Sequence, residues 1–217
     1  MTLIKICGLR RYEDIYYSNE FLPDYVGFIF AKSKRQVTKE FARELGNILD
    51  PRIKKVGVFV NGLPEEVINT VDFCALDCIQ LHGQETIDYI KNLKHLILKR
   101  NMNLEIWKSF RIRNMDSLEE MKNFEDNDID GFLLDTYVEG SHGGTGKSFD
   151  WDIASQARKF GKIILAGGLN SENVKDAIKK VNPIAVDVSS GVETNGFKDR
   201  EKIKAFINNV REKHDHA

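Results

Sequence analysis

The chain has 217 residues, and its 32 Lys and Arg against 33 Asp and Glu give a net charge of −1. This balance argues against a nucleic-acid-binding surface and leaves a small neutral or anionic ligand as the expected partner. No apolar run approaches the roughly 20 residues of a membrane span, so no membrane partner is expected. Three cysteines without a secretory leader pattern are typical of a reduced cytoplasmic protein with no disulfide framework.

Short β-branched and aromatic runs bounded by turn residues predict eight strands. In chain order, the expected strands cover residues 3–7, 25–30, 55–60, 78–81, 105–110, 131–135, 162–166 and 184–188. A segment with helical periodicity follows each strand, at residues 13–20, 38–49, 63–73, 84–93, 115–124, 150–160, 171–180 and 199–213. The length suits one large unit, so we expect a single domain over residues 1–211 with a polar tail at 212–217.

Local signals refine some of these boundaries. Thr38 ahead of Phe41 predicts one helix start, and Ser171 followed by Val174 predicts another. The fourth and fifth strands are the least distinct, because residues 96–98 between them have the composition of a strand as well.

Eight strand–helix units fit a closed parallel (β/α)8 barrel, the TIM-barrel fold. A doubly wound open sheet also alternates strands and helices, but its dinucleotide-binding form carries a G-x-G-x-x-G motif after the first strand. Here the first strand leads into "KICG" at residues 5–8, and the glycine-rich stretches come late. The order of these motifs favours the barrel.

The glycine-rich stretches follow the seventh and eighth strands, where barrel enzymes often hold a phosphate group. Gly167 and Gly168 can turn without a Cβ clash, and "SSGVE" supplies Ser189, Ser190 and Gly191. Backbone N–H groups from both loops could converge on one phosphate, helped by the positive end of a helix. Either loop alone is an ordinary turn signal, but their joint position predicts a phosphate site.

In a barrel, function is expected at the carboxyl ends of the strands. The polar residues that the predicted strands place there are Cys7, residues 33–35, Asn61, Gln80, His82, Arg111, Asp135 and residues 187–191. They include a thiol, two acids and a guanidinium group, which packing alone does not require. Cys74 and Cys78 lack the further Cys or His partners of a zinc site, and both are interpreted as structural.

Seven motifs occur in a fixed order along the chain. They are "KICGLR" at 5–10, "GFIFAKSKRQV" at 27–37, "VGVFVN" at 56–61, "IQLHG" at 79–83, "LLDT" at 133–136 with "GGTGKSFDW" at 143–151, "LAGGLNSENV" at 165–174 and "VDVSSGVE" at 186–193. In this order they resemble the phosphoribosylanthranilate isomerase family of tryptophan biosynthesis. The resemblance runs from the first residues to beyond Asp199, while residues 91–128 contribute little to it.

The resemblance implies a (β/α)8 barrel that uses no metal and no redox cofactor. It also implies a phosphosugar substrate, N-(5-phosphoribosyl)anthranilate, and its Amadori rearrangement to 1-(2-carboxyphenylamino)-1-deoxy-D-ribulose 5-phosphate. This reaction needs an acid that protonates the ring oxygen and a base that removes the proton at sugar C2. The family pattern places the base at Cys7 and the acid at Asp135.

The resemblance also covers substrate binding. Arg35 is expected to bind the anthranilate carboxylate through two parallel charge-assisted hydrogen bonds. The alternative is that it belongs to a solvated run of charged residues, 32–35. Gln80 and His82 are expected to line the pocket, although a satisfied turn histidine is the alternative for His82. Asp187 is expected to bind ribose hydroxyls or to support the phosphate loop. Lys5 could also point into the barrel and influence the charge of the neighbouring thiol.

Both catalytic roles make demands on pKa values. Cys7 must be partly thiolate, although a free thiol has a pKa near 8.5, and Asp135 must hold a proton, although a free aspartate has a pKa near 3.9. A nearby cation could lower the first pKa, and desolvation could raise the second. The plainer alternatives are a small core residue for Cys7 and a turn cap for Asp135. The glycine-rich loop at 135–151 is expected to cover the site, with a merely flexible loop as the alternative.

Two other classes of function remain open from the residues. Another phosphate-binding barrel enzyme, such as a ribulose-phosphate epimerase or an indole-forming lyase, would share the late glycine loops but use other catalytic residues. A non-catalytic phosphosugar-binding module would keep only the barrel. The presence of Cys7, Arg35 and Asp135 favours the isomerase. For the oligomeric state, either a monomer or a homodimer is expected.

Overall fold

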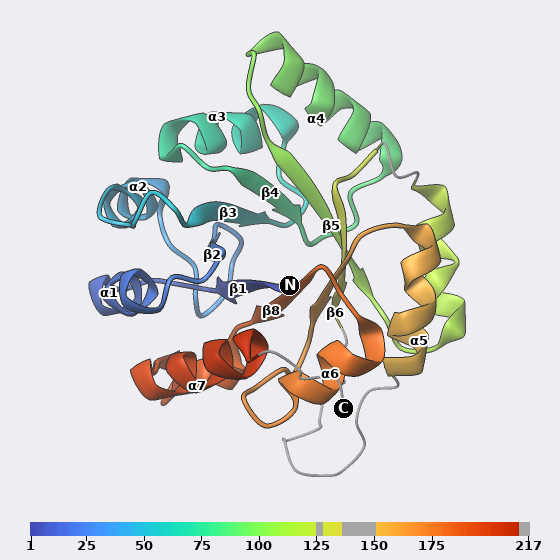
Figure 1. Ribbon diagram of the computed structural model, residues 1–217. Helices are drawn as coiled ribbons and strands as arrows, with labels where there is room; N and C mark the ends of the chain where they lie inside the picture. Colours follow the sequence, from blue (N-terminus) through green and yellow to red (C-terminus); the bar gives the residue numbers. More distant parts are fainter. Residues whose placement is uncertain (125–127, 136–150, 213–217) are drawn as a thin grey trace.

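A computed structural model of the chain describes residues 1–124, 128–135 and 151–212. Eight parallel strands close into a barrel in chain order, as Figure 1 shows. They are β1 (Leu3–Cys7), β2 (Tyr25–Ile29), β3 (Lys54–Phe59), β4 (Cys78–Leu81), β5 (Glu105–Arg111), β6 (Gly131–Asp135), β7 (Ile163–Ala166) and β8 (Ala185–Val188). Because β1 pairs with β8, the ring is closed and the predicted TIM barrel is confirmed.

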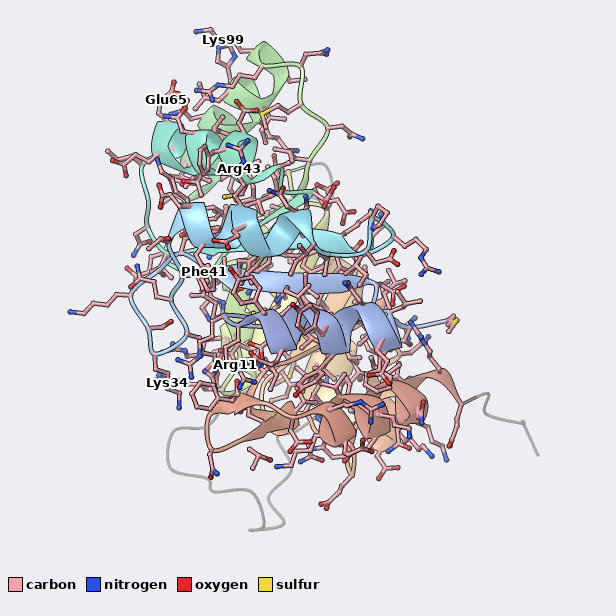
Figure 2. The ribbon with its side chains drawn as sticks, turned by 90° about the vertical axis from the view of Figure 1, so that its left-hand side faces the viewer. Arg11, Lys34, Phe41, Arg43, Glu65 and Lys99 are labelled. Atoms are coloured by element: carbon pink, nitrogen blue, oxygen red, sulfur yellow. The ribbon has the colours of Figure 1, made fainter. Side chains whose placement is uncertain are left out.

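Helices form a ring outside the strands (Figure 1). They are α1 (Tyr12–Phe21), α2 (Lys39–Asn47), α3 (Pro64–Cys74), α4 (Ile87–Lys99), α5 (Trp151–Gln156), α6 (Val174–Val181) and α7 (Arg200–Arg211). Their apolar faces pack on fully buried strand residues such as Ile4, Val26 and Phe28 to form the outer core. Charged side chains, including Arg43 on α2 and Glu65 on α3, lie on the outer surface in Figure 2.

The inner face of the barrel is a second, smaller core. Successive side chains of a strand point to opposite faces, and the inward-pointing ones form one cluster that includes Tyr25, Val56, Cys78, Trp107 and Leu133. Nearer the carboxyl ends of the strands, the same alternation turns polar residues inward: Lys5, Gln80, Ser109, Asp135 and Asp187. The interior therefore changes from apolar to polar at the level where function is expected.

The segment after β5 departs from its predicted helix. Residues 115–124 contain two 3-10 helices, η1 (Met115–Leu118) and η2 (Glu120–Asn123). Asn114 and Ser117 cap each other's backbone N–H groups, and this reciprocal pair closes the first turn within a few residues. Residues 96–98, the competing strand candidate, belong to α4.

Side-chain caps fix the starts of two helices. The Thr38 side chain accepts a hydrogen bond from the backbone N–H of Phe41, as predicted for the start of α2. The other predicted start, at Ser171, is wrong, because α6 begins at Val174. The Asn170 side chain accepts two backbone hydrogen bonds from the residues in between and holds them in a turn.

A short hairpin lies between the barrel and its last helix. The 3-10 helix η4 (Ser190–Val192) follows β8, and β9 (Glu193–Thr194) pairs with β10 (Phe197–Lys198). The turn residues Asn195 and Gly196 have positive φ angles of 53° and 80°, which is typical of tight hairpins. A further 3-10 helix, η3 (Ala157–Phe160), continues α5, and α7 ends at Arg211.

Two sequence predictions concern the rest of the chain. Residues 213–217 of the predicted polar tail lie outside the described residues. Among the helices that the structure describes, none has the length and apolar character needed to cross a membrane.

Candidate active site

The carboxyl end of the barrel gathers the predicted site residues. Cys7 ends β1, Asp135 ends β6, and Asp187 is the penultimate residue of β8. In the closed order of the barrel, β7 and β8 separate β6 from β1 on one side, and the other four strands separate them on the other. The thiol and the Asp135 carboxyl group therefore come from different sides of the barrel mouth.

A buried ion pair lies beside Cys7. Lys5 Nζ donates a 2.8 Å hydrogen bond to Asp187 Oδ2, and the two side chains are 0% and 8% exposed. A Cβ atom on Gly27 would lie 2.9 Å from the Cys7 sulfur and 3.2 Å from Lys5 Cε, so both side chains use the space that this glycine leaves. Burial alone lowers the pKa of Lys5, but the charge of Asp187 and then the sulfur of Cys7 outweigh it and raise that pKa.

The pKa of Cys7 is raised, mainly because burial penalises the thiolate. Lys5 and Lys198 act in the opposite direction, and the carboxylate of Asp187 adds to the increase. Burial therefore opposes the partly ionised thiol that a base at this position requires, while Lys5 and Lys198 favour it. The role of Cys7 as the base stays a prediction.

Arg35 forms a bidentate ion pair with Glu193, the first residue of β9. Its Nε and Nη2 each donate a 2.7 Å hydrogen bond to one carboxylate oxygen. Lys198 Nζ donates a 2.7 Å bond to the same carboxylate and a 3.0 Å bond to the Ser189 carbonyl. A Cβ atom on Gly8 would come within 2.6 Å of Arg35 Cδ, so the arginine stem lies over the end of β1. Arg35 is therefore part of the barrel mouth rather than of a solvated charge run.

The glycine-rich loops after β7 and β8 touch each other. A Cβ atom on Gly191 would lie 1.9 Å from the Leu169 carbonyl oxygen. Gly167 and Gly168 have φ angles of 87° and 66°, which glycine adopts without strain. In the part of the chain that the structure describes, the N–H groups of Gly168 and Gly191 donate to no protein acceptor. These N–H groups are available to an anion, and phosphate binding by the two loops stays a prediction.

Ser189 and Ser190, also predicted to bind phosphate, are placed differently. The Ser189 hydroxyl donates a 3.1 Å hydrogen bond to the Cys7 carbonyl and so ties this loop to β1. Ser190 is the first residue of η4. The Ser189 side chain is thus engaged with the protein, and binding of an anion there depends on the backbone and on Ser190.

A second cluster of polar side chains lies at the carboxyl ends of β4, β5 and β6. His82 Nδ1 lies 2.8 Å from Ser109 Oγ and 3.3 Å from Gln80 Nε2, and His82 Nε2 lies 3.6 Å from Asp135 Oδ2. His82, Ser109 and Asp135 border a cavity of about 430 Å³ that extends to Arg111. A cavity of this volume suits a small-molecule ligand.

Two predicted substrate-binding residues have unsatisfied buried oxygens. Gln80 Oε1 and Asp187 Oδ1 are the buried side-chain polar atoms that lack a hydrogen-bond partner among the residues described. An unsatisfied buried acceptor costs about 1–3 kcal/mol. Donors from a bound ligand, such as ribose hydroxyls, would remove this cost at both atoms.

Sequence reasoning missed Lys108 and Glu85. Lys108 Nζ lies 3.3 Å from Glu85 Oε2 and donates a 2.8 Å bond to the Gly83 carbonyl, while both side chains are 1% exposed. Glu85 also accepts a hydrogen bond from the Gly83 N–H. This buried pair fixes the turn that carries His82. A lysine at an outward strand position, where apolar residues normally pack against helices, was the available signal.

A second cavity lies away from these polar residues. A larger cavity of about 670 Å³ opens at the amino ends of the strands, bordered by Thr2, Asp130 and Lys162. Barrel enzymes bind their substrates at the carboxyl ends, so the smaller cavity is the candidate. Residues 136–150 of the predicted covering loop lie outside the described residues. Within the described ranges, no group of three or more His, Cys, Asp and Glu side chains could hold a metal ion.

Comparison with known proteins identifies the family. Residues 4–209 match the family model described as N-(5'phosphoribosyl)anthranilate (PRA) isomerase. The chain belongs to this family. An N-(5'-phosphoribosyl)anthranilate isomerase from Acetivibrio thermocellus is 55% identical over 214 residues, which cover 98% of this chain and 97% of the relative.

Solved structures of phosphoribosylanthranilate isomerases share the fold. The enzyme of Thermotoga maritima has a TM-score of 0.86 and 39% identity, over 97% of this chain and 99% of its own. Another structure, with a TM-score of 0.83 and 37% identity over the same shares, holds reduced 1-(o-carboxyphenylamino)-1-deoxyribulose 5-phosphate. The resemblance to the isomerase family seen in the sequence is confirmed.

Proposed function

We propose that the chain catalyses the Amadori rearrangement of N-(5-phosphoribosyl)anthranilate in tryptophan biosynthesis. The chain is an aldose–ketose isomerase, and its product is 1-(2-carboxyphenylamino)-1-deoxy-D-ribulose 5-phosphate. Family membership supports the reaction. The observation that carries its assignment to residues is the position of Cys7, beside a buried Lys5–Asp187 pair and across the barrel mouth from Asp135.

The rearrangement moves protons without changing the composition of the substrate. Asp135 donates a proton to the ring oxygen as the C1–O bond breaks, which leaves an open-chain iminium ion. The Cys7 thiolate then removes the proton at C2, which gives an enolamine. Transfer of one proton to C1 and release of the C2 hydroxyl proton give the ketose; the thiol returns one proton and Asp135 recovers one, so both groups end in their starting states. His82, held by Ser109, lines the pocket on the side of the acid.

The charges around the thiol favour an anion at the mouth. Burial raises the pKa of Cys7, and Lys5 and Lys198 partly offset this effect. Each of these lysines pairs with a carboxylate, whereas Arg35 shares its carboxylate with Lys198. Three cations therefore face two carboxylates, and the remaining positive charge favours a thiolate or an anionic group of the substrate.

Binding is distributed over the same end of the barrel. The N–H groups of Gly168 and Gly191, with Gly167, Ser189 and Ser190 in the same loops, hold the phosphate group. Gln80 Oε1 and Asp187 Oδ1 accept hydrogen bonds from sugar hydroxyls, and Arg35 binds the anthranilate carboxylate. The substrate is thus held at both of its anionic ends, with the reacting carbons between them.

The proposal needs no metal ion and no redox cofactor, because both proton transfers use side chains of the chain itself. The phosphosugar is the expected partner, with neither nucleic acid nor membrane involved. We place the protein in the cytoplasm, as a monomer or a homodimer.

Steady-state conversion of N-(5-phosphoribosyl)anthranilate in the presence of EDTA tests this function. We expect turnover to be unaffected by the chelator. Binding of the phosphosugar without turnover would instead support a binding module. Turnover of ribulose 5-phosphate or of an indole-forming substrate in place of the anthranilate would support another barrel enzyme.

A further inference from the structure

We propose that Glu193 and Lys198 are positioning residues that hold Arg35 by one edge of its guanidinium group and leave the other edge to the substrate carboxylate. This inference rests on the proposed function, in which Arg35 binds that carboxylate. It names what fixes the specificity of the site for a carboxylated aromatic amine, and it concerns binding rather than proton transfer.

A guanidinium group has two edges on which a carboxylate can form two parallel hydrogen bonds. One edge consists of Nε and Nη2, and the other of Nη1 and Nη2. Glu193 occupies the first edge of Arg35 through two 2.7 Å bonds. Nη1 of Arg35 donates to no acceptor within residues 1–124, 128–135 and 151–212, and the side chain keeps 15% exposure. The second edge therefore keeps a donor, Nη1, that the described residues leave for a ligand.

Glu193 is itself held in place. Its side chain is 6% exposed, and Lys198 Nζ donates a bond to Oε1, the oxygen that also accepts from Arg35 Nε. Lys198 is 1% exposed and is fixed by the Ser189 carbonyl. Burial raises the pKa of Glu193, but the hydrogen bonds from Arg35 and then Lys198 outweigh it and lower that pKa, so the carboxylate stays ionised.

The charge of this cluster points to an anion. Arg35 and Lys198 share one carboxylate, so the three side chains carry a net charge of +1 in a largely buried place. An unbalanced charge in such a place is costly, and a substrate carboxylate on the second edge of Arg35 balances it.

The same residues connect the two ends of the substrate. Ser189 belongs to the predicted phosphate loop and accepts a hydrogen bond from Lys198, which pairs with Glu193, the partner of Arg35. A single segment, residues 189–198, thus supplies both a phosphate-binding backbone and the anchor of the carboxylate-binding side chain. The spacing between the phosphate-binding backbone and the carboxylate-binding side chain of Arg35 is therefore set by one continuous segment of the chain.

The test compares two ligands that differ only in the carboxyl group. They are reduced 1-(o-carboxyphenylamino)-1-deoxyribulose 5-phosphate and its 1-phenylamino counterpart, and isothermal titration calorimetry gives Kd for each. Charge-assisted pairing predicts that the wild type binds the carboxylated ligand ~10-fold or more tightly. In Glu193→Gln and in Lys198→Met we expect this ratio to fall to about 3 or less. Kd for the other ligand should stay nearly unchanged in Glu193→Gln, whereas Lys198→Met also loses the bond to the Ser189 carbonyl and should bind both ligands more weakly.

Glu65→Gln is a matched control, because Glu65 also pairs with an arginine, Arg100, but on the outer surface (Figure 2). Its ratio should equal that of the wild type. An equal loss of affinity for both ligands in Glu193→Gln and Lys198→Met would mean a merely structural role and would overturn the inference. Retention of the ratio in Glu193→Gln, with its loss in Arg35→Gln, would overturn the positioning role alone. A wild type that does not distinguish the ligands would overturn the assignment of Arg35 and this inference with it.

Discussion

Replacing Lys5 by Met removes the cation of the buried pair beside Cys7 and leaves the Asp187 carboxylate without its 2.8 Å partner. Both side chains are buried, so solvent cannot replace the lost interaction. We expect the free energy of unfolding at neutral pH to fall by about 3–5 kcal/mol. For an m-value of about 3 kcal/mol per M of urea, the unfolding midpoint then moves down by ~1–1.7 M.

The pH dependence separates the stabilising role of Lys5 from its effect on the thiol. Because the folded pKa of Lys5 is raised, its contribution to stability is fully present below the pKa of an unfolded lysine and is lost only as strongly alkaline pH is reached. Lys5 also lowers the pKa of Cys7, against the larger effect of burial. In Lys5→Met, the rise of kcat/KM with pH is therefore expected to move to higher pH.

Urea unfolding, followed by circular dichroism and by the fluorescence of the buried Trp107, measures the first effect, and initial rates across neutral and alkaline pH measure the second. Lys5→Met combined with Asp187→Leu should recover part of the lost stability, because no unpaired charge then remains in the barrel. A midpoint shift below ~0.3 M together with an unchanged pH profile would refute the roles assigned to the pair.

Three further predictions concern the site. Cys7→Ser is expected to lower kcat by about 10²–10⁴-fold in steady-state assays. Wild-type kcat/KM is expected to rise with alkaline pH because burial raises the pKa of Cys7; initial rates across a pH series check this, and a flat profile would contradict it. Asp135→Asn is expected to lower the rate constant measured in single-turnover assays by a similar factor, and a near-normal rate constant would exclude Asp135 as the acid. Gly191→Ala would place a Cβ atom 1.9 Å from the Leu169 carbonyl, so we expect a loss of about 3 kcal/mol in unfolding free energy and a higher KM. Gly168→Ala is the control variant, because a Cβ atom there would meet no atom within 4 Å and only the positive φ angle costs about 1 kcal/mol. Equal losses of unfolding free energy in the two variants, measured by urea unfolding, would refute the contact between the loops.

The barrel could be predicted because each strand is a short apolar run between turn residues, and eight such runs leave few other arrangements. Boundaries set by competing side chains could not be predicted in the same way. Asn170, Ser171 and Asn173 all have side chains that can cap a helix, and the start of α6 at Val174 depends on the turn that Asn170 closes after β7. Asn114 and Ser117 likewise shorten a segment whose apolar pattern is that of an α-helix.

The positions of Cys7, Asp135 and the glycine loops could be predicted, because they follow the ends of strands. The ion pairs around them could not be predicted, although the sequence already offers Lys5 as an inward residue beside Cys7. Lys5 and Asp187 are 182 residues apart in the sequence, and they meet only when β8 pairs with β1. Glu193 and Lys198 belong to two-residue strands that have no periodic signal of their own. Their role depends on burial and on contact with Arg35, which only the folded chain provides.

A crystal structure of the protein with reduced 1-(o-carboxyphenylamino)-1-deoxyribulose 5-phosphate would test the proposed arrangement most directly. We predict that the Cys7 sulfur and the Asp135 carboxylate lie on opposite sides of the sugar chain, each within about 3.5 Å of a reacting position. The phosphate should accept hydrogen bonds from the backbone of Gly168 and Gly191. A sugar chain out of reach of Cys7, or a phosphate held away from the loops after β7 and β8, would contradict the mechanism.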